Sequence, residues 1–161
     1  MTTLIEKIAA VPMMSPLGEA LRMRADILRL SDAAHDAVLL PQDPGGLSHA
    51  LRAAFAARMC RHLSNAELTS HYDVYLAHSS DFDAVELAHP DGTCDEPRLN
   101  ALARHIDLLT LAPKDATKED INALKTAGIA ESDIVRLAEL AAFVNYQVRV
   151  VAGLKLLKDV R

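Results

Sequence analysis

Apolar residues recur every three or four positions through most of the chain, and regular alternation of apolar and polar residues is nearly absent. This spacing places apolar side chains on one face of an α-helix. It is clear from Leu17 to Leu28 and from Leu99 to Leu109, and it is longest over 131–157. The pattern predicts an all-α fold, and the short connections favour antiparallel neighbouring helices.

Helix-start residues divide this pattern into segments. A Thr followed three residues later by an acid, at 3–6 and at 117–120, has the spacing of a capping box. Ser-Pro at 15–16 is typical of a helix start, and Ser-Asp at 31–32 either breaks that helix or restarts it. The predicted helices cover 3–10, 16–28, 48–63, 64–78, 97–113, 117–127 and 131–157, with irregular loops over 41–46 and 79–97.

The composition describes a helical protein with few aromatic residues. Half of the 161 residues are hydrophobic, only 4% are aromatic and there is no Trp, so the core must be built from Leu, Ala, Ile, Val and Met. The net charge of -5 argues against nucleic-acid binding, which needs a basic face. No run approaches the roughly 18 apolar residues of a membrane span, so we expect no membrane partner.

The cysteine pattern suggests free thiols. Cys60 and Cys94 lie far apart and have no zinc-type spacing, and the seven His residues form no ligand motif, so we expect no metal site. The chain has no apolar leader with a small-residue cleavage site. Together these observations predict a cytoplasmic protein with reduced thiols and a buried Cys60.

Three segments resemble a known superfamily. They are residues 47–78, Leu-x-x-Ala-Gly-Ile at 124–129, and Asn-x-x-x-Arg at 145–149. They are similar to the carboxymuconolactone decarboxylase and alkylhydroperoxidase-D-like (AhpD-like) superfamily, and Asp-Pro-Gly-Gly-Leu-Ser at 43–48 resembles an uncharacterised bacterial branch of it. The resemblance implies an AhpD-like helical bundle that forms a homo-oligomer. It also implies a single domain over 1–161, with 1–46 as an N-terminal helical extension.

The peroxidases of this superfamily carry Cys-x-x-Cys-x-x-x-His, with a Glu one helix earlier. When this chain is aligned on His71, Ser64 and Glu67 occupy the two Cys positions and Arg52 the position of the acid. Peroxide reduction there needs a reactive thiolate and a second, resolving thiol. Neither Ser nor Glu can supply these groups, so the resemblance implies the fold and a pocket near His71 without the dithiol chemistry.

The candidate catalytic residues are His71 and Glu67. They lie four residues apart on one helical face and are close enough to share a proton or a hydrogen bond. Such a carboxylate–histidine pair is suited to general acid–base catalysis. Ser64 is a candidate for substrate binding. The alternative is that Ser64 and Glu67 form a capping box and only stabilise the helix start.

Four further residues are candidates for substrate binding. Asn145 and Arg149 share a face of the last helix, where an Arg needs either a carboxylate such as Glu67 or an anionic ligand as its partner. Tyr72 offers a hydroxyl, although packing in the core is an equally physical role. Arg52 favours a ligand carboxylate or a salt bridge between subunits.

Several functions remain open. The chain could bind or turn over a small anionic or carbonyl compound near His71, without metal or organic cofactor. The resemblance also allows an enzyme that acts on a lactone acid, with His71 as general acid–base. The alternatives are a peroxidase-related antioxidant that uses a single Cys, and a noncatalytic oligomeric protein. Pocket volume and turnover separate these possibilities.

Overall fold

The computed structural model describes residues 2–159, and helices are the only regular secondary structure in that range. The expected all-α fold is therefore confirmed for this part of the chain. The helices are α1 (Leu4–Ala9), α2 (Pro16–Arg22), α3 (Ala25–Leu39), α4 (His49–His62), α5 (Ala66–Asp73), α6 (Phe82–Leu87), α7 (Pro97–Leu111), the 3-10 helix η1 (Pro113–Asp115), α8 (Lys118–Thr126) and α9 (Glu131–Asp159).

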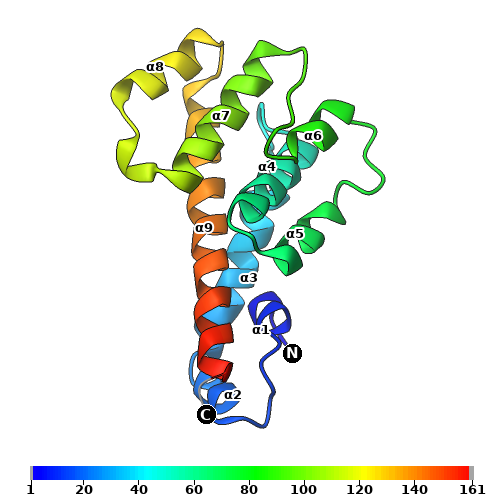
Figure 1. The fold of residues 1–161 in the computed structure, drawn as a ribbon, viewed down its shortest axis with the longest axis vertical. Coiled ribbons are helices and arrows are strands. Elements are labelled where there is room, and N and C mark those ends of the chain that lie inside the picture. Colours follow the sequence, from blue (N-terminus) through cyan, green and yellow to red (C-terminus); the bar gives the residue numbers. More distant parts are fainter. Residues whose placement is uncertain (1, 160–161) are drawn as a thin grey trace.

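The long helix α9 is the spine of the molecule (Figure 1). Helices α4 to α8 gather around its N-terminal half, while α1, α2 and α3 lie along its C-terminal half. Helix α4 packs against α3, α5, α6, α7 and α9, and ten of its 14 residues are buried. Its Ala-rich sequence lets these neighbours approach closely on every side, as in a helix that lies in the middle of a core.

Most of the predicted helix starts are confirmed. Thr3 with Glu6 forms a capping box, and so does Thr117 with Asp120. The Ser48 hydroxyl accepts a hydrogen bond from the Leu51 amide, and Ser15 caps α2 in the same way. Local hydrogen bonding and proline geometry explain these ends without help from the rest of the fold.

The predicted break or restart of a helix at Ser31 and Asp32 was wrong. Helix α3 runs straight through Ser31 and Asp32, and the chain turns earlier, at Met23 and Arg24. The Ser31 hydroxyl donates to the Ile27 carbonyl one turn earlier in α3. It also lies 2.7 Å from the hydroxyl of Tyr146 in α9, within hydrogen-bond distance. A Ser hydroxyl that already has hydrogen-bond partners does not compete for the backbone N–H groups that the helix needs.

The helix predicted over 64–78 and the loop over 79–97 also differ from the structure. Asn65, not Ser64, caps α5, because its side chain accepts from the Leu68 amide at 3.0 Å. Asn is as good a cap as Ser, and the shift of one residue removes Glu67 from the position a capping box requires. Helix α5 ends at Asp73, and α6 lies within the segment expected to be irregular.

Helix α9 is long and apolar enough to cross a membrane by length and composition alone. The core helix of a soluble protein passes the same test. Because α9 contacts α1, α3, α4, α7 and α8 within the described chain, packing in the bundle explains its buried apolar residues, such as Leu137, Leu140 and Val144.

Candidate functional site: a cavity that ends at a histidine pair

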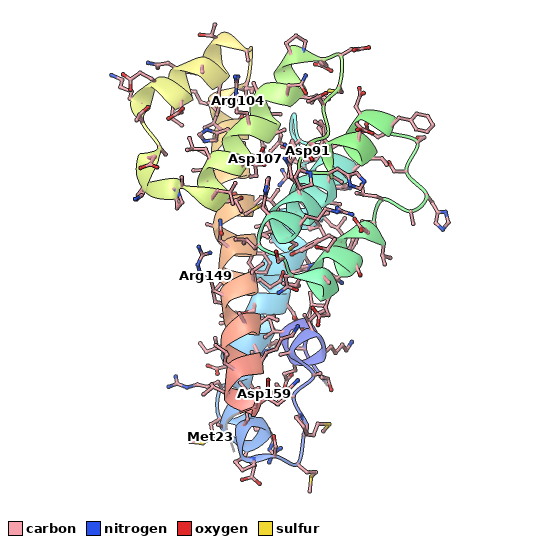
Figure 2. All side chains as sticks on the ribbon, viewed as in Figure 1. Met23, Asp91, Arg104, Asp107, Arg149 and Asp159 are labelled. Carbon is pink, nitrogen blue, oxygen red and sulfur yellow. The ribbon has the colours of Figure 1, made fainter. Side chains whose placement is uncertain are left out.

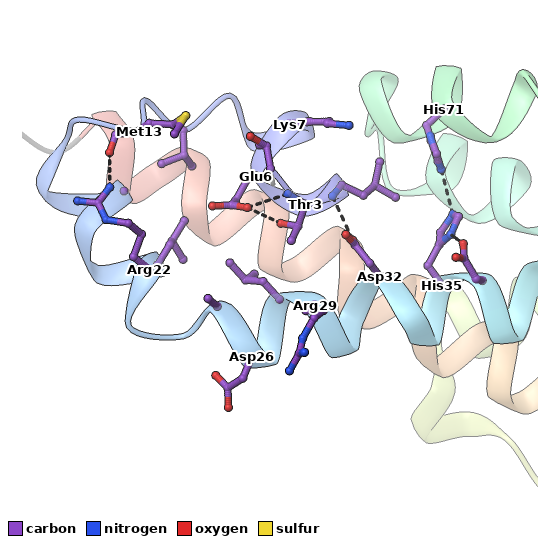
Figure 3. Close-up of a pocket in the computed structure, with 18 residues that line it drawn as sticks. Thr3, Glu6, Lys7, Met13, Arg22, Asp26, Arg29, Asp32, His35 and His71 are labelled. Carbon is purple, nitrogen blue, oxygen red and sulfur yellow. Dashed lines mark hydrogen bonds and ion pairs between the residues drawn. The ribbon is translucent and has the colours of Figure 1, made fainter.

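A cavity of about 780 Å³ lies between α1, α2 and α3 (Figure 3). This volume is within the range of sites that hold small molecules. All but one of the lining residues come from residues 2–36, and the exception is His71 of α5. Figure 3 shows Met13 and Arg22 at one end of the cavity and His35 with His71 at the other.

One face of α3 forms the floor of the cavity. Leu28, Asp32 and His35 follow at intervals of four and three residues, which places them on the same side of the helix. The Asp32 carboxylate accepts a hydrogen bond from the Leu4 amide at 3.1 Å, and this bond attaches the start of α1 to the middle of α3. The cavity is therefore the space that remains between two helices joined at one point.

The polar end of the cavity is a pair of histidines. His35 Nε2 lies 3.0 Å from His71 Nε2, and His35 Nδ1 lies 3.0 Å from Asp36 Oδ1. His35 is buried, and its ring stacks on that of Tyr72. An ionised carboxylate can only accept, so Nδ1 of His35 carries a proton. In neutral His35 the other nitrogen is then an acceptor, and His71 donates to it from Nε2.

This arrangement determines the protonation of His71. Burial, with a smaller contribution from the neighbouring His35, lowers the pKa of His71 to about 4. His71 is therefore neutral at physiological pH. With Nε2 bonded to His35, Nδ1 remains as the acceptor of the ring. A neutral imidazole beside a cavity can accept a hydrogen bond or a proton from a bound molecule.

Glu67 does not join His71. Its carboxylate is exposed and accepts from the Lys155 ammonium at 2.5 Å, and this hydrogen bond lowers the pKa of Glu67. Ser64 is exposed in a left-handed conformation with φ of +53°, outside the cavity. The expected hydrogen bond between Glu67 and His71 is absent from the structure, because α9 offers Glu67 a cation.

Arg149 and Asn145 lie away from this cavity. Arg149 is exposed on the opposite side of α9 from α5, as Figure 2 shows. Its guanidinium donates to the carbonyl and the side-chain oxygen of Asn145, one turn earlier. Of the two partners expected for Arg149, Glu67 was wrong, because it pairs with Lys155; an anionic ligand stays a prediction. Helix α9 is exposed on one side, so Arg149 needs no buried partner.

Tyr72 and Arg52 are parts of the core. Tyr72 is 1% exposed and its hydroxyl donates to Gln147 at 2.6 Å. Arg52 is 2% exposed and donates to the carbonyls of Leu47, Val38 and Pro44, which ties the 41–48 loop to α4. Both side chains are buried, hydrogen-bonded within the protein and absent from the lining of the cavity, so neither is placed to bind a ligand there.

His35 and Asp36 were not among the predicted site residues. The predicted site lay after residue 47, and 1–46 was expected to be an N-terminal helical extension. A signal was available, because His35 follows Leu28 by seven residues and so belongs to the apolar face of its helix. A His on a buried face requires a polar partner. The partner could not be read from the sequence, because α5 is 36 residues away along the chain.

Both thiols are in environments that disfavour a thiolate. Burial raises the pKa of Cys60 to about 12, and burial also raises the pKa of Cys94. Neither residue lines the cavity. The prediction of a buried Cys60 is confirmed. Among the described residues no group of His, Cys, Asp and Glu could hold a metal ion.

Arg58 makes the other dense polar cluster, and that cluster is structural. Its guanidinium donates to both carboxylate oxygens of Asp107 at 2.7 Å and to the carbonyls of Leu87, His89, Pro90 and Gly92. It therefore holds the segment after α6 against α4 and α7. All its donors point at protein acceptors.

The fold can be compared with solved structures. The chain is similar to the crystal structure of an alkylhydroperoxidase AhpD core, described as an uncharacterized peroxidase-related protein from Ralstonia eutropha JMP134. The two chains are 21% identical with a TM-score of 0.64, over 83% of this chain and 71% of the other. The fold is AhpD-like. The expected AhpD-like bundle is thereby confirmed, while likeness at this identity says nothing about shared chemistry.

Neither the protein-family models nor the curated proteins contain a match to this chain. The function of an AhpD-like fold without the dithiol must therefore be argued from the site. In this chain the cavity brings His71 of α5 together with His35 of α3.

Proposed function

We propose that this protein binds a small carbonyl- or carboxylate-bearing molecule in the cavity of α1–α3, and that His71 exchanges a proton with it. The observation that carries the proposal is the series Asp36–His35–His71, which ends at a cavity of suitable size. Neither metal nor organic cofactor is needed for this chemistry. The AhpD-like neighbour contributes the fold to the argument and nothing about the ligand.

The series orients His71 in the way general acid–base catalysis requires. Asp36 selects the tautomer of His35, and His35 in turn fixes the proton of His71 on Nε2. A carbon–hydrogen bond next to a ligand carbonyl would break with transfer of its proton to Nδ1 of His71. The electron pair would move onto the carbonyl oxygen, and return of a proton to carbon would restore the compound.

The thiol-peroxidase alternative has no comparable support. It requires a thiolate near neutral pH, whereas burial raises the pKa of both Cys60 and Cys94. The two positions of the missing dithiol are also unsuited, because Ser64 and Glu67 are exposed and lie outside the cavity. The acid–base proposal uses residues that do meet in the structure.

Deuterium exchange tests the proposal without knowledge of the product. A panel of 2-oxo and 3-oxo carboxylates is incubated with the protein in D₂O, and loss of the carbon-bound proton next to the carbonyl is followed by NMR. We expect exchange above the uncatalysed rate for at least one compound. His71→Gln should remove it, and His78→Gln, at an exposed position outside the cavity, should retain it.

Calorimetry on the same panel separates binding from catalysis. Binding without exchange would leave a ligand-binding protein and would refute the catalytic role of His71. Absence of both, in protein that unfolds cooperatively, would refute the proposed function and favour the noncatalytic alternative. Equal exchange by wild type and His71→Gln would place the chemistry elsewhere.

We also propose that the protein forms a homo-oligomer. Several large apolar side chains are exposed on the two helices that line the long axis, α3 and α9. They are Ile27, Leu30, Val135, Leu156 and Leu157. Contact with a second copy would remove this surface from water. Light scattering tests the proposal, and a monodisperse monomer at micromolar concentration would refute it. The expected cytoplasmic location stays a prediction.

A further inference from the structure

The cavity has two chemically different ends. Away from the histidines its walls are mainly apolar and come from Val11, Met13, Leu21, Ala25 and Leu28. Apolar walls gain most from a ligand that removes apolar surface from water. The histidine end, by contrast, holds the two imidazoles, which are hydrogen-bonded to one another.

Most acidic groups around the cavity are already hydrogen-bonded within the protein. Among the acids, Glu6 accepts from Thr3, Asp32 from Leu4, and Asp36 from His35. Asp26 is exposed at the α2 end of α3. These bonds within the protein use most of the negative groups that line the cavity, so a cationic ligand would find few partners.

The positive groups around the cavity have fewer partners within the protein. Arg22 donates to the Met13 carbonyl, at the apolar end. Lys7 of α1 has no ion pair or hydrogen bond from its ammonium among residues 2–159. In Figure 3 it lies between Thr3 and His71. Arg29 of α3 also lines the cavity and has no ion pair or hydrogen bond from its guanidinium among residues 2–159. The charge that is available to a ligand is therefore cationic, and Lys7 supplies it toward the histidine end.

We propose that the ligand is a straight-chain carboxylate amphiphile. Its carboxylate lies toward Lys7 and His71, and its alkyl chain runs along Val11, Leu21 and Leu28 to Met13. This inference rests on the proposed function and narrows its ligand class. The two features that carry it are the apolar walls on one side and the unpaired ammonium on the other.

A chain-length series tests the inference. Binding of butanoate, hexanoate, octanoate and decanoate is measured by calorimetry at neutral pH, below the concentrations at which they form micelles. Each methylene taken out of water should tighten binding about fourfold, or about 15-fold per step of the series. The gain should end where the chain reaches Met13.

Two substitutions locate the two ends of the ligand. Ala25→Trp adds bulk at an exposed residue that lines the apolar part, and should cancel the gain for the longer chains; Ala33→Trp, at an exposed position of α3 that does not line the cavity, is the control. Lys7→Met should weaken binding of every chain about tenfold. Lys114→Met removes an exposed lysine far from the cavity and should change nothing.

The outcomes distinguish this inference from the proposed function. If short oxo-acids bind at His71 but affinity does not rise with chain length, the amphiphile is refuted and the proposed function stands. If straight-chain amines or alcohols bind as tightly as the carboxylates, the role of Lys7 is refuted. If no compound of either class binds, both proposals fall. Affinity that falls as protein concentration rises would mean that a second copy fills the cavity.

Discussion

Replacement of His71 by Gln should make the protein less sensitive to mild acid. A folded-state pKa near 4 lies below the ordinary value of 6.5, so between these values the unfolded chain binds a proton that the folded chain refuses. The contribution of His71 is fully present above pH 6.5 and is lost as the pH falls toward 4. Without the imidazole, the protein does not lose this part of its stability when the pH falls.

The size of the effect follows from the two pKa values. Between pH 7.5 and pH 5, proton binding by the unfolded state would lower the free energy of unfolding by about 2 kcal/mol. His71 is half-buried, and solvent screening reduces this figure to about 1 kcal/mol. The charged and titratable groups that face the ring are His35 and Asp36 of α3, Tyr72 of α5, Tyr75 just after α5, and Lys7 of α1.

Urea denaturation of wild type and His71→Gln at pH 7.5 and pH 5 measures this difference. The window avoids the carboxylates with lowered pKa values, such as Glu131, which titrate below it. His105 has a pKa that burial also lowers, so His105→Gln serves as a control for a histidine outside the cavity. An equal loss of stability on acidification in wild type and His71→Gln would refute the neutral, half-buried state of His71.

Three further predictions concern the rest of the molecule. Arg58→Met leaves four carbonyls without their donor and the Asp107 carboxylate with His62 as its remaining partner, and should lower the free energy of unfolding in urea by about 3 kcal/mol; a loss below about 1 kcal/mol would contradict the structural role of the cluster. Glu67→Gln breaks an exposed ion pair with Lys155 and should change stability by about 0.5 kcal/mol or less, so a larger loss in the same assay would show that the pair is more than a surface contact. With a chromogenic thiol reagent, Cys60 should react only after unfolding; rapid reaction of both thiols in the native protein would argue against its burial.

The sequence and the structure agree best where local physics is sufficient. The capping box of Thr3 and Glu6, and the Ser48 cap, depend only on residues within three positions. The same local reasoning failed at Ser64 because two adjacent residues are both good caps, and propensity alone cannot choose between them. In the structure Asn65 is the cap, and α5 packs against α4.

The candidate site shows the same division. His71 was identified from its place in the resembled motif, and the structure does put it at a cavity. The partners assigned to it were wrong, because helical spacing shows which residues share a face and not which face another helix covers. Glu67 forms an ion pair with Lys155 of α9, while His71 is hydrogen-bonded to His35 of α3.

The sequence by itself determined the helices, the Ala- and Leu-rich core and the absence of a dithiol, since each depends on residue type and local spacing. Only the tertiary structure decided that residues 2–36 supply nearly all of the cavity and that His35 holds His71. The physical reason is that a pocket is the space left between packed helices. Its lining and its pKa values depend on contacts between residues that are distant along the chain.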